Sequence, residues 1–168
     1  MIPTGSQTVG PFFNFGLTTD VRLGVLKGEG ERIRVEFRVV DGEGVPTPGD
    51  SMIELWQADA QGSYGNVVQG FGRLETQHNG TCVFETVKPG RVDGQAPHIN
   101  VLVFARGLLK HLHTRLYFAG DPANAEDRVL ALVPEARRAT LLARQKEPGL
   151  WCMEIRLQGE NETVFFDV

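Results

Sequence analysis

The sequence predicts a mainly β protein, a single-domain antiparallel β-sandwich with one short helix in its C-terminal half and an extended N-terminal arm. Three observations favour this fold class. Gly (20) and Pro (9) residues interrupt the chain at short intervals, which leaves little room for long helices. Between these interruptions, apolar and polar residues alternate with a period of two more often than they repeat at helical spacing. The alternating runs number seven, which suits two facing sheets.

The first predicted strand covers residues 33–39, where Ile33, Val35 and Phe37 alternate with charged side chains. It leads into DGEG at residues 41–44, a sequence typical of a hairpin turn. The other strands are predicted at residues 52–58, 81–87, 98–106, 112–118, 151–158 and 163–168.

One helix is predicted, at residues 134–144. Pro134 suits the first helical position, and the leucines at 141 and 142 follow the arginines at 137 and 138 at helical spacing.

The N-terminal arm, about residues 1–20, carries Phe12, Phe13 and Phe15 after a Gly-Pro break and shows no strand alternation. A domain without a partner would have difficulty burying three such rings away from solvent. We therefore expect the arm to pack onto a partner chain, since exposed aromatic patches mark interfaces. The alternative is an arm folded back over its own sandwich.

The composition excludes several classes of function. A formal net charge of −4, with Lys and Arg scattered along the chain, offers no basic stripe for nucleic acid. No apolar run approaches the length of a membrane span, and the N-terminus lacks the features of a signal peptide. Cys82 and Cys152 form no redox or metal motif and lie in apolar runs, which predicts two small core residues. These features predict a cytoplasmic protein whose residues 1–168 form one domain.

The sequence PHIN at residues 97–100 looks like half of a metal site. In a strand, His98 and Asn100 project to the same face, where two histidines would hold a transition metal. The neutral amide of Asn100 is a weak ligand for iron or zinc. The pattern predicts a metalloenzyme scaffold that does not itself bind the metal.

Other candidate residues have simpler interpretations. His111 and His113 also share a strand face, but two ligands do not complete a metal site, so we interpret both as ordinary strand residues. Tyr64 fits a loop aromatic. Arg106 fits a solvated strand end, with an anion-binding group as the alternative.

Several motifs, in their order along the chain, resemble those of the intradiol ring-cleaving dioxygenases. They are LWQADAQGSY at residues 55–64, TVKPG at 86–90, PHIN at 97–100 and LYF at 116–118. Four further segments resemble the family's iron-free alpha subunits, namely SQTVGP at 6–11, FARG at 104–107, HLHTRLYF at 111–118 and GENETVFFD at 159–167. The resemblance covers nearly the whole chain.

This resemblance implies a ferric iron site that has lost half of its ligands. In the iron-binding members, two tyrosines and two histidines hold the metal, because tyrosinate oxygens stabilise the ferric state. Tyr64 and His98 match the first tyrosine and the first histidine, whereas Val92 and Asn100 stand at the second positions. We therefore expect four vestigial ligand positions, no metal and no catalytic residue in this chain.

The resemblance also implies a two-chain enzyme in which the beta subunit holds Fe(3+) and alpha-beta units form a hetero-oligomer. Its reaction would insert both atoms of O2 into protocatechuate between the hydroxyl-bearing carbons, which gives 3-carboxy-cis,cis-muconate. Thr8, Gly10, Pro11 and Arg106 would line the partner's substrate pocket, with Arg106 favouring the substrate's carboxylate.

Two alternatives remain open from the sequence. One is a metal-free, transthyretin-like binding module without associated catalysis. The other is an active single-chain dioxygenase with substitute ligands, which Val92 disfavours because a valine cannot ligate a metal.

Overall fold

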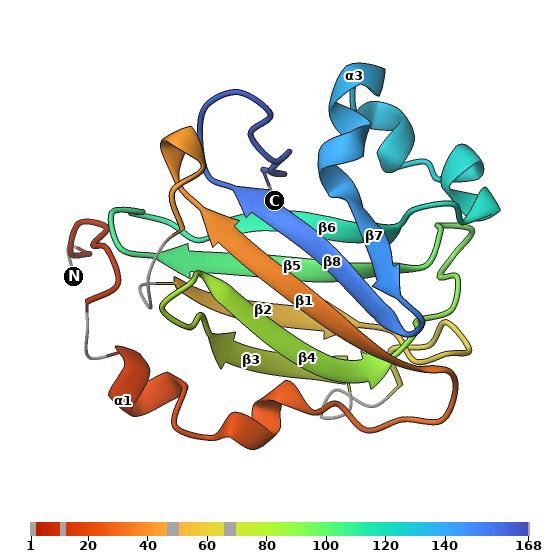
Figure 1. The fold of residues 1–168 in the computed structure, drawn as a ribbon, viewed down its shortest axis with the longest axis horizontal. Coiled ribbons are helices and arrows are strands. Elements are labelled where there is room, and N and C mark those ends of the chain that lie inside the picture. The colour runs from red at the N-terminus through yellow and green to blue at the C-terminus, as the bar shows by residue number, and fades with distance from the viewer. Residues whose placement is uncertain (1–2, 11–12, 47–50, 66–69, 168) are drawn as a thin grey trace.

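Two four-stranded sheets face each other in the computed structural model of the chain (Figure 1). The structure describes residues 3–10, 13–46, 51–65 and 70–167. Strands β3, β2, β5 and β6 form one sheet, and β4, β1, β8 and β7 form the other. Tyr117 and Leu142 pair where β6 meets β7, so hydrogen bonds join the two sheets into one series of eight strands.

The eight strands are β1 (Arg32–Val40), β2 (Ser51–Gln57), β3 (Phe71–Glu75), β4 (Thr81–Val87), β5 (His98–Ala105), β6 (Leu112–Phe118), β7 (Leu142–Glu147) and β8 (Leu150–Arg156). The helical segments are α1 (Phe13–Leu17), η1 (Val21–Gly24), η2 (Gly42–Gly44), η3 (Pro122–Glu126), η4 (Leu130–Leu132), α3 (Glu135–Arg138) and η5 (Ala139–Leu141). None of the helices in the described ranges is long and apolar enough to cross a membrane.

The predicted β-sandwich is confirmed, and its strands form where apolar residues alternate. In β1, Ile33, Val35 and Phe37 are buried while Arg34 faces solvent, so one side of the strand lines the core. Five of the seven pairings between the described strands are antiparallel, whereas β1 with β8 and β6 with β7 run parallel.

The predicted helix at 134–144 is correct only in its first part. The chain is helical through α3 and η5, but Leu142 begins β7 and pairs with Tyr117. Leu141 and Ala143 are both fully buried, a spacing of two that suits a strand. The strand predicted at 163–168 is also wrong within the described residues, where only the bridge between His113 and Phe166 pairs this segment with a strand.

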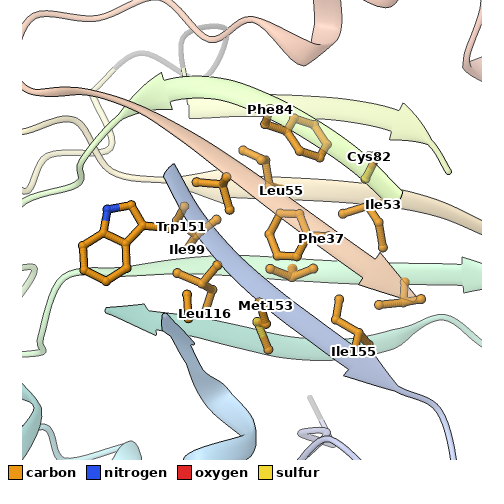
Figure 2. Close-up of a cluster of buried hydrophobic side chains, with 14 of the residues drawn as sticks. Phe37, Ile53, Leu55, Cys82, Phe84, Ile99, Leu116, Trp151, Met153 and Ile155 are labelled. Atoms are coloured by element: carbon orange, nitrogen blue, oxygen red, sulfur yellow. The ribbon is translucent and has the colours of Figure 1, made fainter. Parts of the chain in front are cut away.

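The core fills the space between the two sheets (Figure 2). The Phe37 ring meets the Phe84 ring edge-on at a centroid distance of 5.9 Å, and Phe118 meets Trp151 in the same way at 5.0 Å. Cys82 is part of this core, and burial raises the pKa of its thiol to about 12. Cys152 differs from the prediction, because it is only partly buried and its Sγ lies 3.5 Å from a Glu36 carboxylate oxygen.

The N-terminal segment is not simply extended, because it forms α1 and η1 along the edge made by β3 and β4 (Figure 1). Gly24 packs against Leu74 of β3, and the Leu26 N–H donates to the Glu85 carbonyl of β4 at 2.8 Å. The segment thereby covers two strands that would otherwise present open edges.

A second apolar cluster lies on the other face of β6, beneath the segments η3 to η5. At its centre the buried carboxylate of Asp127 accepts hydrogen bonds from the Tyr117 hydroxyl (3.2 Å) and from the backbone N–H groups of Ala96 (2.7 Å) and Leu130 (2.7 Å). This cluster fixes the chain immediately before β5 against β6.

We expect Phe37→Ala to lower the free energy of unfolding by about 3–5 kcal/mol, because truncation of a fully buried ring leaves a cavity between the sheets. Urea unfolding of the full-length chain measures the effect. The control is Val83→Ala on β4, where the side chain is 41% exposed. Equal losses for the two variants would contradict the placement of the core.

Candidate functional site

The outer face of the sheet β3-β2-β5-β6 carries the residues that the sequence singled out. Ile99 and Leu116 point into the core, so their neighbours His98, Asn100 and Tyr117 point to the opposite face. Two segments border this face, namely the loop after β2, which carries Tyr64, and the turn at residues 92–95, which leads into β5.

The loop after β2 brings Tyr64 to this face through close backbone packing. The Asp59 carboxylate accepts hydrogen bonds from the N–H groups of Gln61 (3.0 Å) and Ser63 (2.8 Å), which folds the loop tightly. Gly62 has φ +83°, and a Cβ there would collide with the carbonyl oxygen of Arg91. Glycine is therefore required for the loop to lie against residues 90–91.

Tyr64 is held in place by the Trp56 ring and by the Asn100 side-chain amide. Its ring stacks on Trp56 of β2, with the centroids 5.8 Å apart and the planes 12° from parallel. The Asn100 side-chain N–H group donates to the Tyr64 hydroxyl at 3.2 Å and to the Trp56 carbonyl at 3.3 Å. Burial raises the pKa of the Tyr64 phenol above its usual value, so Tyr64 stays protonated at neutral pH.

His98 is buried at the start of β5. Its Nδ1 lies 2.8 Å from the Ala96 carbonyl, which can only accept, so Nδ1 carries the proton and Nε2 keeps its lone pair. Burial lowers the pKa of the His98 imidazole, which favours the neutral ring. The ring centroid lies 5.8 Å from that of Tyr117.

Val92 begins a two-residue turn. Asp93 (φ +48°) and Gly94 (φ +75°) occupy left-handed conformations, and the Gln95 N–H donates to the Val92 carbonyl at 2.8 Å. The half-buried Val92 side chain offers no ligand atom.

Arg115 is a residue of this site that the sequence reasoning missed. It lies on β6 directly opposite Asn100 on β5, and its guanidinium donates to the Gln95 side-chain oxygen at 2.7 Å and to the Tyr117 hydroxyl at 3.4 Å. The only sequence signal was the alternation within HLHTRLYF, which places Arg115 and Tyr117 on one strand face.

The residues at this site do not fit a ferric ion. Among the four vestigial ligand positions, Tyr64 is the single phenol and is hydrogen-bonded to an amide, His98 is the single imidazole, and the remaining positions supply a valine and an amide. No group of three or more His, Cys, Asp or Glu residues able to hold a metal occurs in the part of the chain that the structure describes.

A second group of predicted residues lies beyond the other end of β5. The Thr8 hydroxyl accepts a hydrogen bond from the Gly107 N–H at 2.7 Å and donates to the Ala105 carbonyl at 3.4 Å. These bonds tie the N-terminal arm to the turn that carries the exposed Arg106. The Gly10 carbonyl accepts from the Phe13 N–H at 3.1 Å, and Pro11 lies outside the described residues.

A cavity of about 420 Å³ lies beside this turn and extends under the arm. Among the residues that line it are Val9 of the arm, His111 and His113 of the β6 segment and Phe166 near the C-terminus. The His113 and Phe166 ring centroids are 6.2 Å apart, so this histidine packs as an aromatic side chain.

The two groups lie apart. Asn100 and Arg106 are separated by six residues of extended chain, or about 20 Å. In Figure 1, β5 runs from the end next to the helical segments to the end next to the N-terminal arm. Arg106 therefore does not serve the relict metal positions of its own chain.

The chain is similar to several known dioxygenases in sequence or in fold. The model of the Dioxygenase family matches residues 16–158. The chain is 42% identical to the protocatechuate 3,4-dioxygenase alpha chain of Burkholderia cepacia over 98% of this chain and 97% of that protein. It is 35% identical to the beta chain from the same organism over 83% of this chain and 66% of that protein. The dioxygenase domain of a Streptomyces carbohydrate-binding fusion shares the fold, with a TM-score of 0.65 and 22% identity over 96% of this chain and 100% of that one.

We expect Gly62→Ala to lower the free energy of unfolding by at least about 2 kcal/mol and to change Trp56 fluorescence, because the added Cβ forces the Tyr64 loop away from the sheet. The matched control is Gly94→Ala, where φ is also positive but the space around the Cβ is open. Denaturant titration followed by fluorescence measures both effects. A Gly62→Ala protein as stable as Gly94→Ala would contradict the close loop packing.

Proposed function

The chain belongs to the intradiol dioxygenase family, and from that premise we propose that it is the alpha chain of a protocatechuate 3,4-dioxygenase. The resemblance expected from the sequence motifs is thereby confirmed at the level of the family. Identity to the alpha chains of Burkholderia cepacia (42%) and Pseudomonas putida (41%) over nearly the full length supports the more specific assignment. The enzyme would use O2 to cleave protocatechuate between its two hydroxyl-bearing carbons.

The observation that carries the proposal is the separation between Arg106 and the relict metal positions. A guanidinium suits a substrate carboxylate, yet Arg106 lies about 20 Å along β5 from Asn100. The Thr8 arm is bonded to the same turn. A substrate-facing surface so far from the chain's own relict site fits a pocket completed by another chain. Thr8, Gly10, Pro11 and Arg106 are the residues proposed to line it.

Iron belongs, in this proposal, to the beta chain. Intradiol dioxygenases depend on iron, and the residues around Tyr64 and His98 do not fit it. A separate beta chain exists among the relatives, 35% identical to this chain. The part played by this chain would be to close the partner's pocket and to place a positive charge beside the substrate's carboxylate.

The exposed N-terminal side chains also favour a partner. Phe15 is 76% exposed and Val21 75% exposed, with Leu17 and Val25 exposed between and beyond them. The arm is bonded to its own sandwich through Thr8, but this apolar row still faces solvent, which supports the prediction that the arm also packs onto another chain. The proposed partner is the beta chain, in hetero-oligomers of alpha-beta units.

We expect the chain to aggregate when expressed alone and to form a stable equimolar complex when co-expressed with an iron-bearing beta chain. Size-exclusion chromatography and elemental analysis of iron in each separated chain measure this. Phe15→Ser combined with Val21→Ser should reduce complex yield, whereas Leu132→Ser, at an 82% exposed position on η4, should not. A soluble monomer that stays monomeric with the beta chain present would refute the proposal and favour the metal-free binding module.

We expect Arg106→Ala in the assembled complex to lower kcat/KM for protocatechuate roughly tenfold to a hundredfold, the typical cost of losing a hydrogen bond to a charged group. Residual turnover of catechol, which lacks the carboxylate, should change much less. Lys110→Ala is the control, because Lys110 is an exposed cation on the same loop. Equal losses for both substrates would mean that Arg106 is structural.

A further inference from the structure

We infer that Arg115 excludes metal ions from the relict site, because its guanidinium supplies a fixed positive charge among the positions from which an iron-binding relative would coordinate its metal. Two features of this chain then oppose metal binding, unlike in its iron-dependent family. They are the replaced ligands and the positive charge of Arg115. The inference depends on family membership, and not on the assignment as an alpha chain.

The guanidinium is fixed by contacts next to three of the four relict positions. Arg115 pairs across the strands with Asn100. It donates to the side chain of Gln95, the residue that closes the turn begun by Val92. It also reaches the hydroxyl of Tyr117, which pairs across the strands with His98.

No carboxylate forms an ion pair with Arg115 among the residues that the structure describes. The acidic group of this network is Asp127, which accepts a hydrogen bond from the Tyr117 hydroxyl at 3.2 Å. Its oxygens also accept from the N–H groups of Ala96, Val129 and Leu130. These hydrogen bonds, and not an ion pair with Arg115, are the contacts of the Asp127 carboxylate.

A second cation at this place would meet strong repulsion. Arg115 is only partly exposed, and like charges a few ångström apart interact more strongly in such surroundings than in water. An arginine side chain carries its positive charge throughout the neutral pH range. Restoring a histidine ligand should therefore be insufficient for metal binding.

The test compares three variants of the full-length chain in equilibrium dialysis against Co²⁺. Asn100→His alone presents Tyr64, His98 and a new imidazole while Arg115 remains. Adding Arg115→Gln removes the charge and keeps a group that can bond to Gln95, and adding Arg115→Lys keeps a charge. We expect the Gln variant to bind about one Co²⁺ per chain, roughly a hundredfold or more tighter than the other two.

Equal affinity with and without Arg115→Gln, or equal affinity for the Gln and Lys variants, would overturn the inference. Circular dichroism and thermal melting establish that each variant is folded. Asn100→His with Arg115→Met gives a second neutral variant of different shape, so a folding defect of the Gln variant does not decide the result. The absence of tighter binding in a folded neutral variant also refutes the role of Arg115.

This test is independent of the proposed function. A negative result leaves the alpha-chain assignment untouched, because that assignment is tested by co-expression with the beta chain and by Arg106→Ala. Conversely, a chain that never pairs with a beta chain would still be required to show the effect of Arg115 on Co²⁺ binding.

Discussion

The buried carboxylate of Asp127 is the interaction on which the arrangement of the candidate site depends. It joins three segments that are distant in the sequence, through the Ala96 N–H, the Tyr117 hydroxyl and the Leu130 N–H. A buried charge is tolerated only where such hydrogen bonds satisfy it. Because Ala96 is held, His98 enters β5 at a fixed place, and because Tyr117 is held, the outer face of β6 is fixed beside it.

Much of the fold could be predicted from the sequence because alternation by two reports a half-buried strand directly. The predictions failed where local spacing fitted two structures. Leu141 and Leu142 suit a helix, but Leu141 and Ala143 equally suit a strand, and pairing with β6 decides the outcome. Strand β3 was missed because it is five residues long and contains Gly72, which hides its alternation.

The candidate site was predictable only in part, because several of its contacts join residues that are far apart in the sequence. Strand spacing identified His98 and Asn100 as a pair, motif resemblance added Tyr64, and the structure brings Tyr64 and Asn100 into contact. Arg115 could not be found in this way, because its place depends on the register between two strands. The bond between Thr8 and residue 107 likewise joins segments 99 residues apart.

The hydrogen bond between Asn100 and Tyr64 also bears on the order in which a two-chain enzyme of the proposed kind is made. In a metal-bound relative, the loop and the sheet would be bridged through the ion, and completion of the fold would wait for metal delivery. In this chain the Asn100 side-chain amide joins the same two elements by a hydrogen bond, which needs no metal ion. Closure of the Tyr64 loop against the sheet therefore does not depend on the supply of iron.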